Sequence, residues 1–70
     1  MSKIVLKLAD VLKEKEKTVY WLSKETRISN NNLHKMVNNE TNSIRFDKLA
    51  DIMYALEIKD IKEIIEYIPD

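Results

Sequence analysis

The chain of 70 residues has no cysteine and no glycine, and it contains one proline and one histidine. Without cysteine, neither a disulfide framework nor a thiolate metal site can supplement the core of so small a domain. The single histidine, His34, leaves no pair of imidazoles for a zinc site and no Ser/His/Asp set for nucleophilic catalysis. We therefore expect no enzymatic activity, no metal, no cofactor and no small-molecule ligand.

The absence of glycine has a second consequence, because tight turns often need a residue with positive φ. Arg27 and Asn39 stand where two turns are expected, so we predict that they take this left-handed geometry. A left-handed arginine costs on the order of 1 kcal/mol. The sequence therefore predicts a domain of modest stability.

Long apolar runs are also missing. No segment is long enough to span a membrane or to form the hydrophobic part of a signal peptide. The expectation is a cytoplasmic protein that does not contact a membrane.

The net charge is zero, but the charges are unevenly distributed. Residues 1–48 hold ten Lys or Arg against six Asp or Glu, a net charge of +4, whereas residues 49–70 hold two against six, a net charge of −4. This asymmetry predicts one basic and one acidic surface, and a basic surface suits a phosphate backbone. The same charges also suit plain solvation of helices, so charge alone leaves both interpretations open.

Apolar residues recur at helical spacing, and no run shows the sustained alternation of a strand. The pattern predicts one all-α domain over residues 1–70, made of five short helices. The first begins at Ile4 and runs to the charged segment 13–17, and the others cover about residues 18–25, 29–38, 46–56 and 61–68. Thr18 and Ser29 are the expected N-caps of the second and third helices, and Pro69 ends the fifth.

Residues 18–38 have the pattern of a short helix, a turn of about three residues and a second short helix. Small or apolar side chains stand where two such helices must cross closely, namely Leu22, Ser23, Ile28, Leu33 and Met36. This pattern is typical of a helix-turn-helix, whose second helix enters the major groove of DNA.

The chain resembles the small single-domain regulators of the phage repressor and Cro type, the Xre family. The resemblance rests on VYWLSKETRIS, LHKM, SIRFDKLADIMYALEI and IIEYIP, and it covers about residues 4–69. It implies a lambda-repressor-like fold and a transcriptional regulator in which Asn30, Asn31 and Lys35 face base edges and Asn38 lies near the DNA backbone. The departures from the family pattern are Ser23 for alanine, and Arg27 and Asn39 for glycine.

Helical geometry also places the expected base-contacting residues on one face of the third helix, because successive residues are about 100° apart. Asn31, Lys35 and Asn38 fall opposite the apolar face of the third helix, while Asn32 and His34 lie on its flanks and Asn30 at its exposed N-terminal end. Asparagine is a poor helix former, but it pairs with the edge of adenine, as lysine does with guanine. An alternative is that the asparagines reflect an AT-rich coding sequence alone.

Side chains that flank this helix in the sequence suit phosphate contacts, which fix the register of a protein on DNA. The candidates are Thr18, Lys24, Ser29, Asn38, Asn42, Ser43, Arg45 and Lys48. Each is also an ordinary solvated residue, and only the set around one helix favours the phosphate interpretation.

We therefore expect sequence-specific binding of double-stranded DNA by a repressor or other transcriptional regulator. The alternative is a protein-interaction module on the same fold, such as an antitoxin or an adaptor. A homodimer is expected through the C-terminal helix, with Tyr54, Ile58 and Tyr67 at the interface. A monomer that dimerises only on DNA remains the other possibility.

Overall fold

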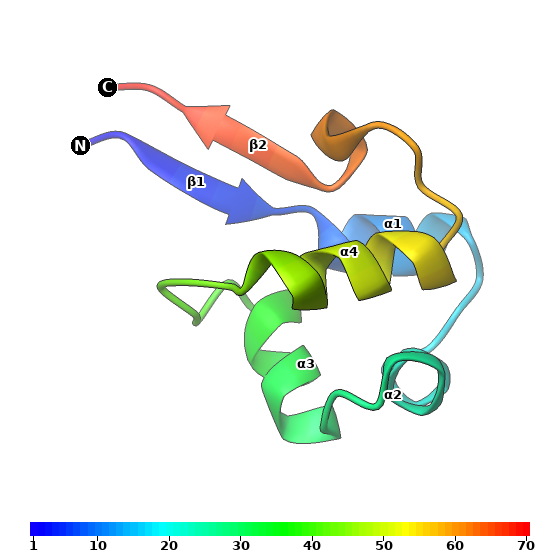
Figure 1. Ribbon diagram of the computed structural model, residues 1–70. Coiled ribbons are helices and arrows are strands. Elements are labelled where there is room, and N and C mark those ends of the chain that lie inside the picture. Colours follow the sequence, from blue (N-terminus) through cyan, green and yellow to red (C-terminus); the bar gives the residue numbers. More distant parts are fainter.

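The computed structural model describes residues 1–70 as four helices and a two-stranded antiparallel sheet (Figure 1). The helices are α1 (Leu8–Glu14), α2 (Val19–Thr26), α3 (Asn30–Val37) and α4 (Phe46–Ala55). The strands are β1 (Lys3–Leu6) and β2 (Ile65–Ile68), and a short 3-10 helix, η1 (Ile61–Glu63), precedes β2. The sheet brings the two ends of the chain together on one side of the molecule, and α2 and α3 lie on the other (Figure 1).

The expectation of an all-α domain with five helices is wrong at both ends of the chain. The residues that were expected to begin the first helix form β1, and residues 61–68 form η1 and β2 in place of a fifth helix. Isoleucine and valine dominate these segments, and β-branched side chains favour strands because they lose rotamer freedom in helices. The register pairs Lys3 with Ile68 and Leu6 with Ile65.

Eleven buried hydrophobic side chains form one core. They come from all four helices, from the turn after α2 and from the segment between α4 and β2, and they are Leu8, Leu12, Leu22, Ile28, Leu33, Met36, Leu49, Ile52, Leu56, Ile58 and Ile64. Ile4 and Ile61, with which two of the expected helices began, lie outside this core and are 67% and 54% exposed. None of the helices has the length and apolar character that crossing a membrane would require.

Three of the helices end in the same way without glycine. The residue after the C-cap is left-handed in α1, α3 and α4, with φ of 56° at Glu16, 57° at Asn39 and 57° at Glu57. Two backbone hydrogen bonds close each end; after α3, the N–H of Glu40 donates to the Lys35 carbonyl at 2.8 Å and the N–H of Asn39 to the Met36 carbonyl at 3.1 Å. The prediction for Asn39 is confirmed, whereas those at Glu16 and Glu57 were not anticipated.

Replacing Glu57 with glycine is expected to raise the free energy of unfolding by about 0.5–1 kcal/mol. Glycine takes positive φ without steric strain, and the change also removes a negative charge from the carboxyl end of α4. The greater freedom of glycine in the unfolded chain offsets part of this gain. Chemical denaturation measures the difference.

The matched control is Ala50→Gly, because Ala50 is exposed and lies inside the same helix. Glycine costs about 1 kcal/mol at such a position, so the same new residue should have opposite effects at the two sites. A loss of stability in both variants would contradict the strain assigned to Glu57.

Candidate nucleic-acid interface

The helices α2 and α3 have eight residues each and are joined by Arg27, Ile28 and Ser29. Both begin at the predicted caps: the Thr18 hydroxyl accepts the Trp21 N–H at 3.0 Å, and the Ser29 hydroxyl accepts the Asn32 N–H at 3.2 Å. Thr18 and Ser29 are also exposed. Because a hydroxyl that accepts one bond still has a proton to donate, each cap retains a donor for a phosphate oxygen.

The turn between the two helices is held by Thr26, a residue that the sequence pattern did not single out. Its buried hydroxyl donates to the Leu22 carbonyl at 2.8 Å and accepts the Ile28 N–H at 3.3 Å. Arg27 has the predicted left-handed geometry, with φ of 62°, and its N–H donates to the Ser23 carbonyl at 2.8 Å. These bonds fix the angle between α2 and α3.

The helix α3 has one buried face and one exposed face. Leu33 is fully buried and Met36 is 7% exposed, so these two side chains attach the helix to the core. The five residues that were expected to read bases are all exposed, namely Asn30, Asn31, Asn32, His34 and Lys35. The structure thus brings these five candidates together on the outside of one helix.

The carboxyl end of α3 is tied to the sheet by the side chain of Asn39. Its amide oxygen accepts the Leu6 N–H at 2.7 Å, and its amide nitrogen donates to the Leu6 carbonyl at 3.0 Å. The two residues are 33 positions apart in the chain. This pair of hydrogen bonds fixes the end of the exposed helix relative to β1, and no local sequence pattern indicates it.

The charge around α3 has the sign that a phosphate backbone requires. Residues 26–39 contain no aspartate or glutamate, and they carry Arg27, His34 and Lys35. The nearest carboxylates in the sequence are Glu25 and Glu40, at the two ends of the segment. An anionic ligand can therefore approach the exposed face of α3 without meeting a carboxylate on that helix.

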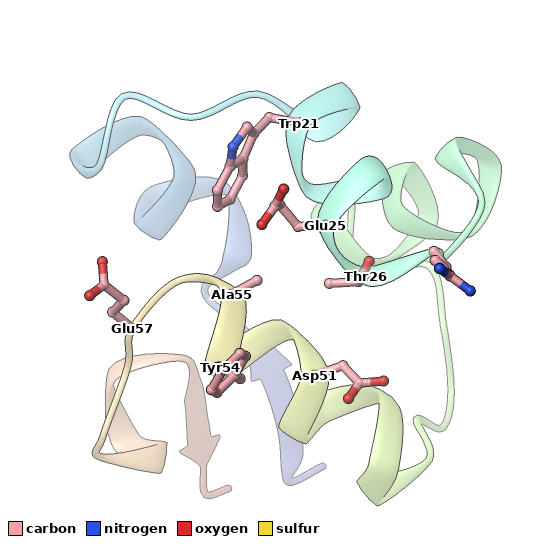
Figure 2. A pocket seen from close by; sticks show the side chains of 8 residues that line it. Trp21, Glu25, Thr26, Asp51, Tyr54, Ala55 and Glu57 are labelled. Atoms are coloured by element: carbon pink, nitrogen blue, oxygen red, sulfur yellow. The ribbon is translucent and has the colours of Figure 1, made fainter.

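A cleft of about 620 Å³ lies between α2 and α4 and has the opposite character (Figure 2). Its walls carry three carboxylates and one cation, together with two aromatic side chains; they are Glu25, Asp51, Glu57, Arg27, Trp21 and Tyr54. The excess of negative charge repels a phosphate backbone, so this larger cavity is not the candidate interface. No group of three or more His, Cys, Asp or Glu side chains is placed to hold a metal ion.

The other phosphate candidates lie on both sides of α3 in the chain. Asn38, Asn42, Ser43 and Arg45 are exposed in the connection from α3 to α4, whereas Lys48 is half-buried on α4. On α2, the exposed Lys24 places its ammonium group 5.2 Å from the centre of the Tyr20 ring.

Arg45 pairs with Asp47 at 3.1 Å, and both side chains are largely exposed. Exposed pairs of this kind contribute at most about 1 kcal/mol. Asp47 therefore leaves the Arg45 guanidinium available to a phosphate.

The residues expected at a dimer interface do not form one surface. Ile58 is 7% exposed and belongs to the core, whereas Tyr54 and Tyr67 are 88% and 62% exposed. The C-terminal helix that was expected to carry the interface is absent, since Tyr67 lies on β2 and Ile58 lies between α4 and η1. Tyr54 borders the acidic cleft (Figure 2).

Comparison with known proteins gives one family and one solved structure. The family model described as a Cro/C1-type HTH DNA-binding domain, where HTH denotes helix-turn-helix, matches residues 7–70. The fold is similar to the crystal structure of a proposed DNA-binding protein from Bacteroides fragilis, with a TM-score of 0.81 and 23% sequence identity over 91% of this chain and 100% of the other. No curated protein matches the chain.

Replacing Thr26 with valine is expected to lower the free energy of unfolding by about 1–3 kcal/mol. Valine has nearly the same shape, but it leaves the N–H of the buried Ile28 without its partner. The loss should be accompanied by weaker DNA binding, because the angle between α2 and α3 depends on this hydroxyl.

The control is Thr41→Val, since Thr41 is half-buried and its hydroxyl makes no hydrogen bond within the chain. This change should alter stability by less than about 0.5 kcal/mol. Equal losses in thermal or chemical unfolding for the two variants would remove the special role of Thr26.

Proposed function

Since this chain belongs to the family of Cro/C1-type HTH DNA-binding domains, we propose that it regulates transcription by binding a specific sequence of double-stranded DNA. Its role is that of a repressor that occupies an operator through the major groove. The observation that carries this proposal is the exposed face of α3, which combines amides and a lysine and contains no carboxylate.

Base recognition is assigned to Asn30, Asn31 and Lys35, with Asn32 and His34 at the margins of the same face. An asparagine amide donates to N7 of adenine and accepts from its N6 amino group, and a lysine donates to O6 and N7 of guanine. The buried Leu33 and Met36 hold the helix from behind. The short amides therefore have little freedom of position when the helix lies in the groove, which favours discrimination between base pairs.

Register on the DNA is assigned to residues that precede and follow α3 in the chain. Thr18, Lys24 and Ser29 precede it, and the following group comprises Asn38, Asn42, Ser43, Arg45 and Lys48. Contacts with phosphates position a protein without carrying sequence information. These two groups of donors, one before and one after α3 in the chain, are assigned to the two phosphate backbones that border a major groove.

The direct test is selection of bound sequences from a random pool of double-stranded DNA, followed by titration of the selected site at several salt concentrations. Enrichment of a common sequence and a steep fall of affinity with salt are expected. A pool without enrichment would instead favour the same fold acting as a protein-interaction module, such as an antitoxin or an adaptor.

Asn31→Ala should weaken binding to the selected site by about 1–3 kcal/mol, because the amide that pairs with a base is lost. The preference at one base pair should relax at the same time. Binding titrations against a set of single-base variants of the site measure both effects.

Asn42→Ala is the matched control, because it removes the same amide from the loop that is assigned to phosphate. It should weaken binding to all of these DNA sequences by a similar factor. A uniform loss for Asn31→Ala as well would move Asn31 from base reading to backbone contact.

Arg45→Gln should lower the slope of log affinity against log salt by about one unit, on specific and random DNA alike. The control is Lys62→Gln, since Lys62 also lies two residues from its acidic partner, Asp60, in an exposed ion pair. Lys62 belongs to η1, on the side of the molecule away from α3 (Figure 1). An equal change of slope in both variants would show that net charge, and not position beside α3, sets the effect.

A further inference from the structure

The six asparagines of the chain differ in how firmly the structure holds them and the peptide bonds that follow them. Five lie within or directly after α3, and the sixth, Asn42, lies in the connection from α3 to α4 (Figure 1). Asn42 is exposed, and its side-chain amide makes no hydrogen bond within the chain. The N–H of the next residue, the exposed Ser43, also has no partner within the chain. The amide carbon of Asn42 and the nitrogen that follows it can therefore approach each other.

The asparagines in α3 are restrained by the helix. When a backbone nitrogen attacks the amide carbon of the preceding asparagine, a five-membered ring forms, and this ring excludes the ψ values of a helix. Asn30, Asn31 and Asn32 all belong to α3. The N–H of Asn32 also donates to the Ser29 hydroxyl at 3.2 Å, and that of Leu33 donates to the Ser29 carbonyl at 3.0 Å. Ring closure at these positions requires the helix to open first.

Asn38 and Asn39 are restrained by the hydrogen bonds that end α3. The N–H of Asn39, which would attack the Asn38 amide, donates to the Met36 carbonyl at 3.1 Å. The N–H of Glu40 donates to a carbonyl of α3 at 2.8 Å, and the amide of Asn39 is bonded to Leu6. A nitrogen that must first leave its hydrogen bond reacts only in the small fraction of molecules that open locally.

We propose that Asn42 is a site of spontaneous deamidation and that this reaction lowers the affinity of the protein for DNA. The Ser43 nitrogen loses its proton to solvent and forms a bond with the amide carbon of Asn42, and the amide nitrogen leaves as ammonia. Water then opens the ring at either carbonyl and gives aspartate or isoaspartate. One water is consumed and one ammonia is released, so the reaction needs neither an enzyme nor a redox partner. The small side chain of Ser43 leaves its backbone nitrogen accessible.

The effect on affinity rests on the proposed function, in which Asn42 belongs to the residues assigned to phosphate contacts. Residues 41–46 contain no carboxylate. Deamidation adds one negative charge to this segment, where it repels phosphate and offsets the cation of Arg45. The affinity for DNA therefore falls with the age of each molecule.

Incubation of the intact chain at mildly alkaline pH, followed by cleavage after glutamate and lysine, tests the site. The cleavage separates residues 26–35, 36–40 and 41–48, and Asn42 is the single asparagine of the last peptide. Deamidation raises the mass of the peptide that carries it. The mass change in residues 41–48 should appear at least about tenfold faster than in the other two peptides, because those require local opening. Any smaller ratio overturns the assignment.

The same incubation in denaturant separates the effect of the fold from that of the local sequence. Unfolding releases the backbone around α3, so residues 26–35 and 36–40 should react faster, whereas the rate at Asn42 should change little. The ratio between the peptides should therefore fall. An unchanged ratio would show that the Asn-Ser pair alone selects the site, and it would overturn the role assigned to the structure.

DNA binding by the incubated protein tests the consequence. The wild-type protein should lose affinity in step with the converted fraction. Asn42→Asp should bind about fivefold more weakly than Asn42→Ala, the effect of one unit charge about 4 Å from another in water. Asn42→Gln is the matched control, because it keeps the amide but would need a six-membered ring, which closes far more slowly. Its affinity should not change during the incubation.

The outcomes separate the two parts of the proposal from the proposed function. Equal affinities of Asn42→Asp and Asn42→Ala, or an equal loss in Asn42→Gln on incubation, would overturn the effect on DNA binding. A fresh protein without any DNA binding would reject the proposed function together with that effect. The masses decide the modification site in every case, because they are measured without DNA.

Discussion

The orientation of every helix in this protein depends on backbone positions that require a positive φ, and the chain has no glycine to place at them. Glu16, Arg27, Asn39 and Glu57 take this geometry after the four helices. Each costs on the order of 1 kcal/mol, and the cost is offset by the hydrogen bonds that close the helix ends and by the core that the turns bring together. Arg27 matters most for the helix-turn-helix, because its conformation lies in the turn that sets the crossing of α2 and α3.

The stability of α3 comes from its two ends and its buried face. The residues on its exposed face therefore do not need to stabilise the helix. Its asparagines are poor helix formers. The Ser29 cap begins the helix, the hydrogen bonds at Asn39 end it, and Leu33 and Met36 bury its inner face. Because packing supplies most of the stability of a short helix, short amides are tolerated at positions that contact only solvent or a ligand. This arrangement allows one short helix to hold several asparagines without losing its structure.

The sequence predicted the parts of the fold that depend on local patterns. The helix-turn-helix, its two caps, the left-handed Arg27 and Asn39, and membership of the phage repressor and Cro type are confirmed. The prediction failed where residues far apart in the chain meet. The strands β1 and β2 lie at opposite ends of the sequence and pair with each other. In addition, the isoleucines of the second strand stand at helical spacing, so this segment was predicted to be a helix. The hydrogen bonds between Asn39 and Leu6 were missed for the same reason. The hydroxyl of Thr26 was missed because a threonine near a turn looks like any polar residue.

The same long-range contacts connect the sheet to the exposed helix α3. The side chain of Asn39 reaches Leu6, 33 positions away in the chain, and its two hydrogen bonds hold the carboxyl end of α3 against β1. The same strand pairs with β2, so that Leu6 lies opposite Ile65. The orientation of α3 therefore depends on the pairing of the two ends of the chain as well as on the turn that follows α2.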